Sequence, residues 1–181
     1  NPVDVSPTTN ILTFSFNPLS MSNKILNYDF FNRPVLTVAE ELIGKSIVRK
    51  LDGETLCGLI TEVEAYDGPD DKACHAHHGR TQRTEVMYGP AGHWYVYFCY
   101  GMHWMLNVIT GPIGYPAGVL IRGVESVDGP ARVAKHFKID HVFNGMKADP
   151  HSGLWIEDCG IAIPKETIKR TPRIGVDYAE E

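Results

Sequence analysis

The chain has 181 residues, 43% of them hydrophobic, and a formal net charge of −5 at pH 7. This length fits one ordinary domain with a sizeable core, and no apolar run approaches the roughly 20 residues of a membrane span. The acidic balance argues against a general nucleic-acid binder, which is expected to be basic. Four widely spaced cysteines without a CxxC pair argue against a disulfide framework or a zinc site and are typical of reduced thiols. Because the start also lacks a secretory signal, we expect an intracellular protein with no membrane association.

The N-terminal part of the chain differs in composition from the rest. Residues 1–23 carry Asn, Pro, Ser and Thr with little periodicity. We expect a flexible arm over 1–27 and a folded domain over 28–181. Apolar residues with helical spacing predict a helix over 35–43, and Gly44 follows as its C-terminal stop.

The remainder of the chain alternates short strands with few helices. The expected elements are strands over 47–51 and 56–65 joined at Asp52-Gly53, a helical turn over 70–76, a hairpin over 93–109, a strand over 119–124, a helix over 130–137 and a strand over 154–156. Antiparallel hairpins combined with few helices favour the α+β class.

One strand end carries an unusual set of side chains. Glu62, Glu64 and Tyr66 share a face, because side chains alternate along a strand. A solvated acidic face is the ordinary interpretation of such a pattern. The alternative is a catalytic wall, with a carboxylate to move a proton and a ring to stack on a flat substrate.

Two aromatic and β-branched runs meet at Gly101-Met102. A connection of two residues that starts with Gly predicts a type II′ hairpin. The residues that would share faces are Tyr95 with Tyr97 on the first strand, and His103, Met105 and Asn107 on the second. Tyr100 would then lie at the tip with nothing to cover it. A core hairpin with an aromatic corner is one interpretation, and an exposed ring that wedges open a nucleic-acid duplex is the other.

These residues resemble the alkyladenine (3-methyladenine) DNA glycosylase family, from about Tyr28 to Glu181. The resemblance is carried by segments 42–45, 62–71, 75–76, 83–89, 95–103, 120–122 and 172–176, which occur in the family's order. It implies a single mixed α+β domain with a curved antiparallel sheet, few helices and a protruding β-hairpin that inserts into DNA. The family usually carries a longer segment between Val127 and Gly129.

The resemblance also implies an activity. The chain would be a monofunctional DNA glycosylase of base excision repair that flips alkylated or deaminated purines out of duplex DNA and hydrolyses the N-glycosidic bond. Glu64 would be the general base that activates water, and Arg122 would hold that water and favour the charged carboxylate. No lysine falls in the matching segments that would form the site, which argues against a Schiff-base lyase step.

Further roles follow from the same resemblance. The flipped base would lie among Tyr66, His75 and Tyr97, with Asn107 excluding the 2-amino group of guanine and the Ile174 carbonyl completing the water site. Tyr100 would fill the vacated stack. The remaining expected DNA contacts are Gly101, Met102, His103 and Met87.

The expected partner is double-stranded DNA that contains damaged purines, bound by a monomer without a cofactor or a metal. Segment 129–175 holds eight bases against five acids, whereas 51–71 holds seven acids and no Lys or Arg. An acidic protein with such a basic segment is expected to bind DNA modestly and in a salt-sensitive way. The alternatives are a metal-dependent hydrolase that uses His75, His77 and His78, a non-catalytic DNA-damage binder, and a small-molecule nucleosidase.

Overall fold

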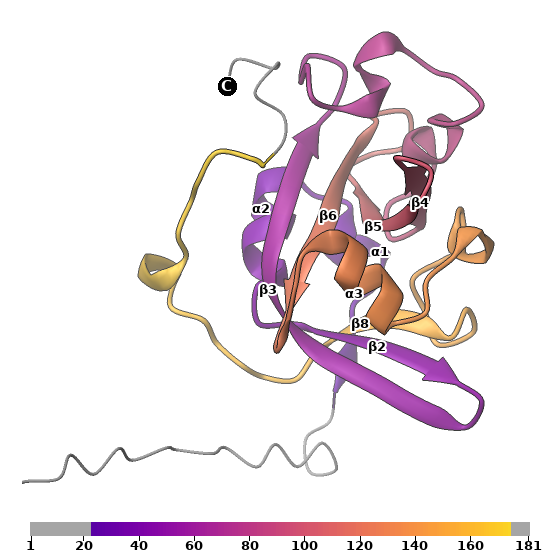
Figure 1. Ribbon diagram of the computed structural model, residues 1–181. Coiled ribbons are helices and arrows are strands. Elements are labelled where there is room, and N and C mark those ends of the chain that lie inside the picture. The colour runs from indigo at the N-terminus through magenta and orange to yellow at the C-terminus, as the bar shows by residue number, and fades with distance from the viewer. Residues whose placement is uncertain (1–22, 175–181) are drawn as a thin grey trace, which may run out of the picture.

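An eight-stranded antiparallel sheet organises residues 23–174, the part of the chain that the computed structural model describes (Figure 1). The strand order is β1-β8-β2-β3-β6-β5-β4, and β7 pairs with β6 beside this path. The strands are β1 (Lys24–Ile25), β2 (Ser46–Leu51), β3 (Glu54–Asp67), β4 (Trp94–Cys99), β5 (His103–Thr110), β6 (Ala117–Val124), β7 (Val127–Asp128) and β8 (Leu154–Asp158). The expected α+β class is confirmed.

The described helices are short. They are α1 (Tyr28–Phe31), α2 (Val35–Leu42) and α3 (Pro130–His136), with four 3₁₀ turns at His75–His78, Glu85–Tyr88, His141–Phe143 and Lys165–Thr167. Helix α2 lies against β3 and β6, and α3 lies against β5 and β6 (Figure 1). The residues of α2 with helical spacing are the ones that are buried, as the sequence predicts. Gly44 follows α2 with a φ of +84°, a conformation that glycine adopts without steric cost.

The sheet curves strongly. Trp94 of β4, the last strand in the order, is fully buried, and its Nε1 donates to the Leu154 carbonyl of β8 at 3.1 Å. Strand β8 lies near the opposite end of the strand order, so the two ends of the sheet approach one another. The main core is one cluster of buried residues that includes side chains from both α2 and α3.

The fold begins earlier than the composition indicates. The sequence places residues up to 27 in a flexible arm, whereas Lys24 and Ile25 pair with Asp158 and Glu157 of β8. Leu26 is only 6% exposed. A short apolar stretch becomes ordered here because a distant strand offers an unpaired edge, which local composition does not reveal. Residues 1–22 lie outside the described part of the chain.

The helical turn expected over 70–76 is displaced. The structure has a 3₁₀ turn over His75–His78 instead. The preceding loop is closed by Asp71, whose carboxylate accepts hydrogen bonds from the backbone N–H groups of Asp67 and Ala73. An aspartate that bonds the backbone in this way competes with helix formation, and the prediction was wrong for that reason.

The turn between β4 and β5 also differs from the prediction. Three residues, 100–102, connect the strands, and the Met102 N–H donates to the Cys99 carbonyl at 3.1 Å. Tyr100 and Gly101 have φ of +52° and +67°, the left-handed pair of a type I′ turn. Gly101 adopts this conformation freely, whereas Tyr100 does so at a cost of about 1–2 kcal/mol.

We predict that Trp94→Ala lowers the free energy of unfolding by about 3–5 kcal/mol, because a fully buried ring and its hydrogen bond across the curve are removed. Urea unfolding at pH 7 measures this. Leu36→Ala is the control, since Leu36 is 63% exposed and is expected to change stability by no more than about 0.5 kcal/mol. Equal effects of the two substitutions would contradict the assignment of Trp94 to the core.

Candidate active site

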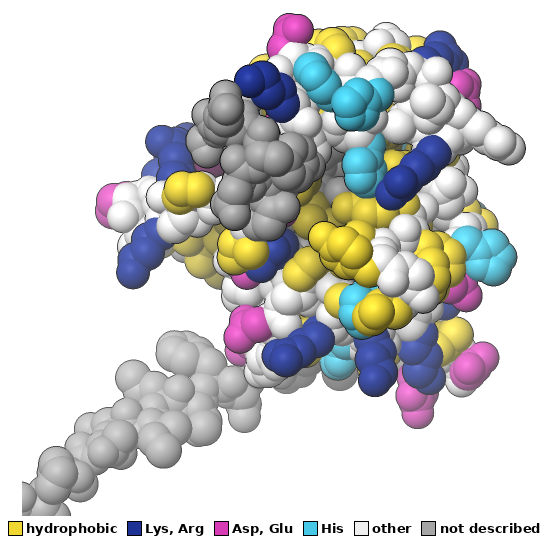
Figure 2. Space-filling view, turned by 45° about the horizontal axis from the view of Figure 1, so that its top comes forward, with side chains coloured by type: hydrophobic (Ala, Val, Ile, Leu, Met, Phe, Trp, Pro, Cys, Tyr) yellow, Lys and Arg dark blue, Asp and Glu magenta, His cyan; other side chains and the backbone are white. Residues whose placement is uncertain are grey.

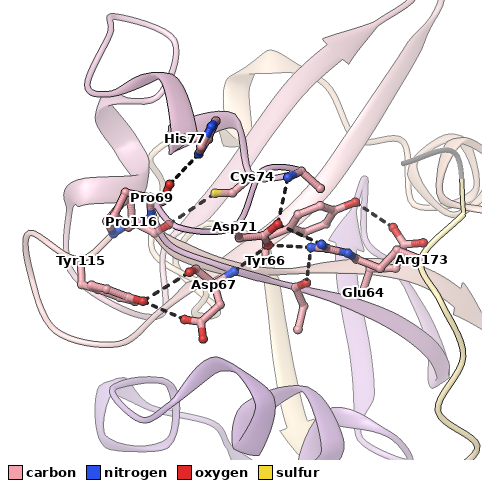
Figure 3. Close-up of polar contacts among 12 residues, drawn as sticks. Glu64, Tyr66, Asp67, Pro69, Asp71, Cys74, His77, Tyr115, Pro116 and Arg173 are labelled. Atoms are coloured by element: carbon pink, nitrogen blue, oxygen red, sulfur yellow. Dashed lines mark hydrogen bonds and ion pairs between the residues drawn. The ribbon is translucent and has the colours of Figure 1, made fainter. Parts of the chain in front are cut away.

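Glu64 is a buried carboxylate held by three hydrogen-bond donors. Its side chain is 7% exposed. Arg122 Nη1 and the Ile174 N–H donate to Oε1 at 3.3 and 3.0 Å, and the Tyr66 hydroxyl donates to Oε2 at 2.9 Å. Figure 3 shows the contact with Tyr66. Charged and neutral donors together replace the water that burial removes from this carboxylate.

Arg122 lies at an irregularity in the pairing of β3 with β6. Ile60 pairs with Val124, Glu62 with Gly123 and Val63 with Ile121, so the register skips Thr61 and Arg122. Bulges of this kind re-aim side chains next to active sites. Arg122 is 14% exposed and bonds both acids of the predicted face, since its Nε donates to Glu62 Oε1 at 3.0 Å.

A cavity of about 280 Å³ opens in front of Glu64. Its wall contains every residue predicted for catalysis and for the base pocket, together with two of those predicted for DNA contact. These residues are Glu64, Arg122, Tyr66, His75, Tyr97, Asn107 and Ile174, with Tyr100 and Met87. The volume is near the lower end of the range of about 300–1,000 Å³ that is typical of small-molecule sites.

Further residues of the cavity wall were missed from the sequence. They are Ala73, Tyr95, Cys99, Met105, Gly118, Leu120 and Pro130. Strand alternation provides the signal for most of them. Tyr95 pairs with Asn107 and Tyr97 with Met105, so these four side chains share the pocket face. Pro130 comes from the start of α3, and no pattern in the sequence links it to the site.

His75 is held against two tyrosines. Its Nδ1 lies 3.0 Å from the Tyr95 hydroxyl, and its ring packs edge-on against Tyr97 with centroids 4.5 Å apart. Burial lowers the pKa of His75 to about 4, and the nearby charge of Arg83 acts in the same direction. The imidazole is therefore neutral at pH 7. Arg83 itself lies over Tyr97, with its guanidinium carbon 5.2 Å from the ring centroid.

The phenols of the pocket keep their protons. Burial raises the pKa of Tyr66 far above its usual value, and the charge and the hydrogen bond of Glu64 act in the same direction. Burial likewise raises the pKa of Tyr97. Tyr66 consequently remains a hydrogen-bond donor to Glu64 over the whole neutral pH range.

Asn107 is 5% exposed, and its Nδ2 donates to the Tyr95 carbonyl at 3.2 Å. This contact is the ordinary role of a strand asparagine, and it also fixes the amide in the cavity wall. Ile174 is 63% exposed, and its backbone N–H contacts Glu64, whereas the prediction named its carbonyl.

The β4–β5 turn presents exposed apolar side chains beside the cavity. Tyr100 is 84% and Met102 64% exposed, and Gly101 and His103 are also exposed. Figure 2 shows a group of hydrophobic side chains on one face of the molecule with His, Lys and Arg side chains at its borders. Met87, in contrast, is only 3% exposed and lies in the cavity wall.

The structure does not bring the histidines of segment 75–78 into one cluster. His77 Nδ1 lies 2.7 Å from the Pro69 carbonyl, whereas His75 points to Tyr95. Within residues 23–174, no three His, Cys, Asp or Glu side chains are arranged to hold a metal ion. Within the same residues, no helix is long and apolar enough to cross a membrane.

Comparison with known proteins identifies the class of this enzyme. The sequence model of the family described as Methylpurine-DNA glycosylase matches residues 29–129 and 125–181. A "Putative 3-methyladenine DNA glycosylase" of Bacillus cereus is 42% identical over 180 residues, in an alignment that covers 84% of this chain and 88% of that protein. A relative of the same name from Methanocella arvoryzae is 41% identical over 177 residues, 87% of each chain. The protein is thus a DNA repair hydrolase that acts on N-glycosyl bonds. It belongs to the methylpurine-DNA glycosylase family.

We predict that His75→Phe reduces the acid sensitivity of the fold. Because His75 has a pKa of about 4 when folded and about 6.5 when unfolded, its contribution to stability is complete above pH 6.5 and is lost as the pH falls toward 4. The loss is about 1.4 kcal/mol per pH unit. Urea unfolding at pH 7 and pH 5 should therefore show a decrease that is about 2 kcal/mol smaller in the variant than in the parent. Equal decreases would show that the buried imidazole does not resist protonation.

Proposed function

We propose that this enzyme flips an alkylated or deaminated purine out of duplex DNA and hydrolyses its N-glycosidic bond with a water molecule activated by Glu64. The observation that carries the proposal is the position of Glu64, a buried carboxylate with three donors, in the wall of an aromatic cavity. The 3-methyladenine specificity in the names of the relatives supports the choice of an alkylated purine.

Glu64 is suited to act as the general base. A carboxylate close to C1′ can accept a proton from the attacking water and can stabilise the positive charge of an oxocarbenium-like transition state. Arg122 contacts Glu64 Oε1 and supplies N–H groups that can orient the water. Ile174 contacts the same oxygen, so its backbone lies next to the proposed water position.

The aromatic residues are suited to hold the base. Tyr66 and Tyr97 offer ring faces, and stacking on an aromatic ring contributes about 1–3 kcal/mol per base with little dependence on base identity. A neutral His75 does not repel a positively charged alkylpurine, and the electron-rich rings attract it. Asn107 is fixed in the wall, where it can exclude the 2-amino group of guanine by a clash or an unpaired polar group.

The β4–β5 turn is suited to open the duplex. The exposed ring of Tyr100 lies at the cavity mouth and can fill the stack that the flipped nucleotide leaves. Gly101 and Met102 of the same turn and His103 at the start of β5 follow it, and these exposed residues can contact the neighbouring nucleotides. The proposed partner is double-stranded DNA with damaged purines, bound inside the cell by a monomer without a cofactor.

We predict that Glu64→Gln slows base release about 10²–10⁴-fold, which is the usual contribution of general-base catalysis. The amide keeps the shape of the side chain but cannot accept the proton. Single-turnover rates on duplexes that hold 3-methyladenine or hypoxanthine measure this, and affinity for the damaged duplex is expected to change only a few-fold. Glu54→Gln, an exposed change on the same strand, is the control. A parental rate in the Glu64 variant would remove this residue from the mechanism, and activity of the parent on free nucleosides would point to a nucleosidase.

We predict that Tyr100→Ala weakens binding to a duplex with a central abasic site and leaves folding stability nearly unchanged, because the ring is 84% exposed. Alanine keeps the strained left-handed backbone, so the comparison isolates the ring. Base release from a stable pair should slow more than release from a mismatch. Tyr28→Ala, at an exposed tyrosine of α1 that is not part of the cavity wall, is the control. A large shift in Tm with unchanged duplex affinity would overturn the wedge role.

A further inference from the structure

We propose that the ion pair between Asp71 and Arg173 positions the water-activating carboxylate Glu64, so that both partners are positioning residues for the reaction. This inference rests on the proposed function of Glu64. In this proposal, the ion pair does not touch the reacting groups. It holds two of the three hydrogen-bond donors to Glu64, the Tyr66 hydroxyl and the Ile174 N–H.

The pair is bidentate and buried. Arg173 Nη1 lies 2.6 Å from Asp71 Oδ2, and Nη2 lies 2.9 Å from Oδ1 (Figure 3). The two side chains are 15% and 8% exposed. Arg173 Nη1 also donates to the Ala65 carbonyl at 3.1 Å, which ties the guanidinium to the backbone of β3 next to Glu64. The planar fork of arginine matches this carboxylate, and lysine cannot reproduce the two parallel bonds.

Arg173 reaches Glu64 by two routes. Ile174 follows it directly in the chain and donates its N–H to Glu64 Oε1 at 3.0 Å. The Arg173 guanidinium carbon also lies 4.9 Å from the centroid of the Tyr66 ring, whose hydroxyl donates to Glu64 Oε2. A shift of Arg173 would therefore displace both donors together.

Asp71 extends the same connection to the base pocket. It accepts hydrogen bonds from the N–H groups of Asp67 and Ala73 at 3.0 and 2.9 Å, and this loop leads directly to His75. Burial opposes the ionisation of Asp71, but the bonds from Arg173 and from the two amides outweigh it and hold the pKa below its usual value. The carboxylate is thus charged at neutral pH and the ion pair is intact.

A buried ion pair is a weak source of net stability, because the loss of hydration offsets the attraction between the charges. The two parallel bonds do, however, fix the position of Arg173 relative to Asp71. The segment after β8 is also tied to the body by an ion pair between Arg170 and Glu40 of α2, in which Arg170 is 81% exposed. That second pair anchors the same segment to α2 instead of to the loop of Asp71, and it makes a matched control.

The experiment compares the parent enzyme with Arg173→Met, Arg173→Lys, Asp71→Asn and the control Arg170→Met. The readouts are the single-turnover rate on a lesion-containing duplex, the affinity for an abasic-site duplex, and the Tm. We expect Arg173→Met to slow the rate about 10²-fold, as small misplacements at active sites do, with affinity within about threefold of the parent. Arg173→Lys should recover part of the rate, and Arg170→Met should match the parent.

The double variant Arg173→Met with Asp71→Asn provides the coupling test. If the pair acts as one unit, its rate is no lower than that of the slower single variant. Additive losses of rate in the double variant would overturn the proposal. A parental rate in Arg173→Met would also overturn it, and so would a decrease in both rate and duplex affinity that parallels the decrease in Tm. If Arg173→Met does not fold, a parental rate in Arg173→Lys overturns it equally. A parent enzyme that releases no base from any duplex would instead contradict the proposed function.

Discussion

A carboxylate removed from water must be surrounded by donors, and this constraint on Glu64 governs the arrangement of the site. The three donors come from β3, from β6 and from the segment after β8. These segments are far apart in the sequence, so the carboxylate becomes satisfied only when the sheet and its C-terminal segment are assembled. Folding and completion of the hydrogen bonds to Glu64 are therefore one process in this protein.

The same constraint accounts for the charge distribution. The acidic stretch 51–71 does not form a purely solvated face, because Glu62 and Glu64 share Arg122, and Asp71 binds Arg173. The irregular register around Glu62 lets one arginine contact both acids. Burial keeps Tyr66 and His75 uncharged at neutral pH, so neutral aromatic side chains line the cavity beside the pair of Glu64 and Arg122.

Much of the site was readable from the sequence because it follows the two-residue period of strands. Alternation alone places Glu64 and Tyr66 on one face, and it places Tyr97 and Asn107 on facing strands of a hairpin. The positions of α2, β2, β3, β6 and α3 follow from apolar spacing and from Gly and Pro signals. The family resemblance then assigned roles to residues that local pattern alone leaves open between core, surface and catalysis.

The sequence by itself therefore determined the fold class, the strands other than β1 and β7, and the residues that share each of those strand faces, since these depend on neighbours in the chain. The tertiary structure alone decided the pairing of Lys24–Ile25 with β8, the left-handed Tyr100 in the turn, the burial of Met87 and the bond between Asp71 and Arg173. The strand pairing, the burial and the ion pair depend on contacts between elements that are separate in the chain, and the left-handed Tyr100 carries a backbone strain that its own conformational preference opposes. Local propensity carries no information about contacts between distant partners, and Asp71 and Arg173, for example, are 102 residues apart along the chain.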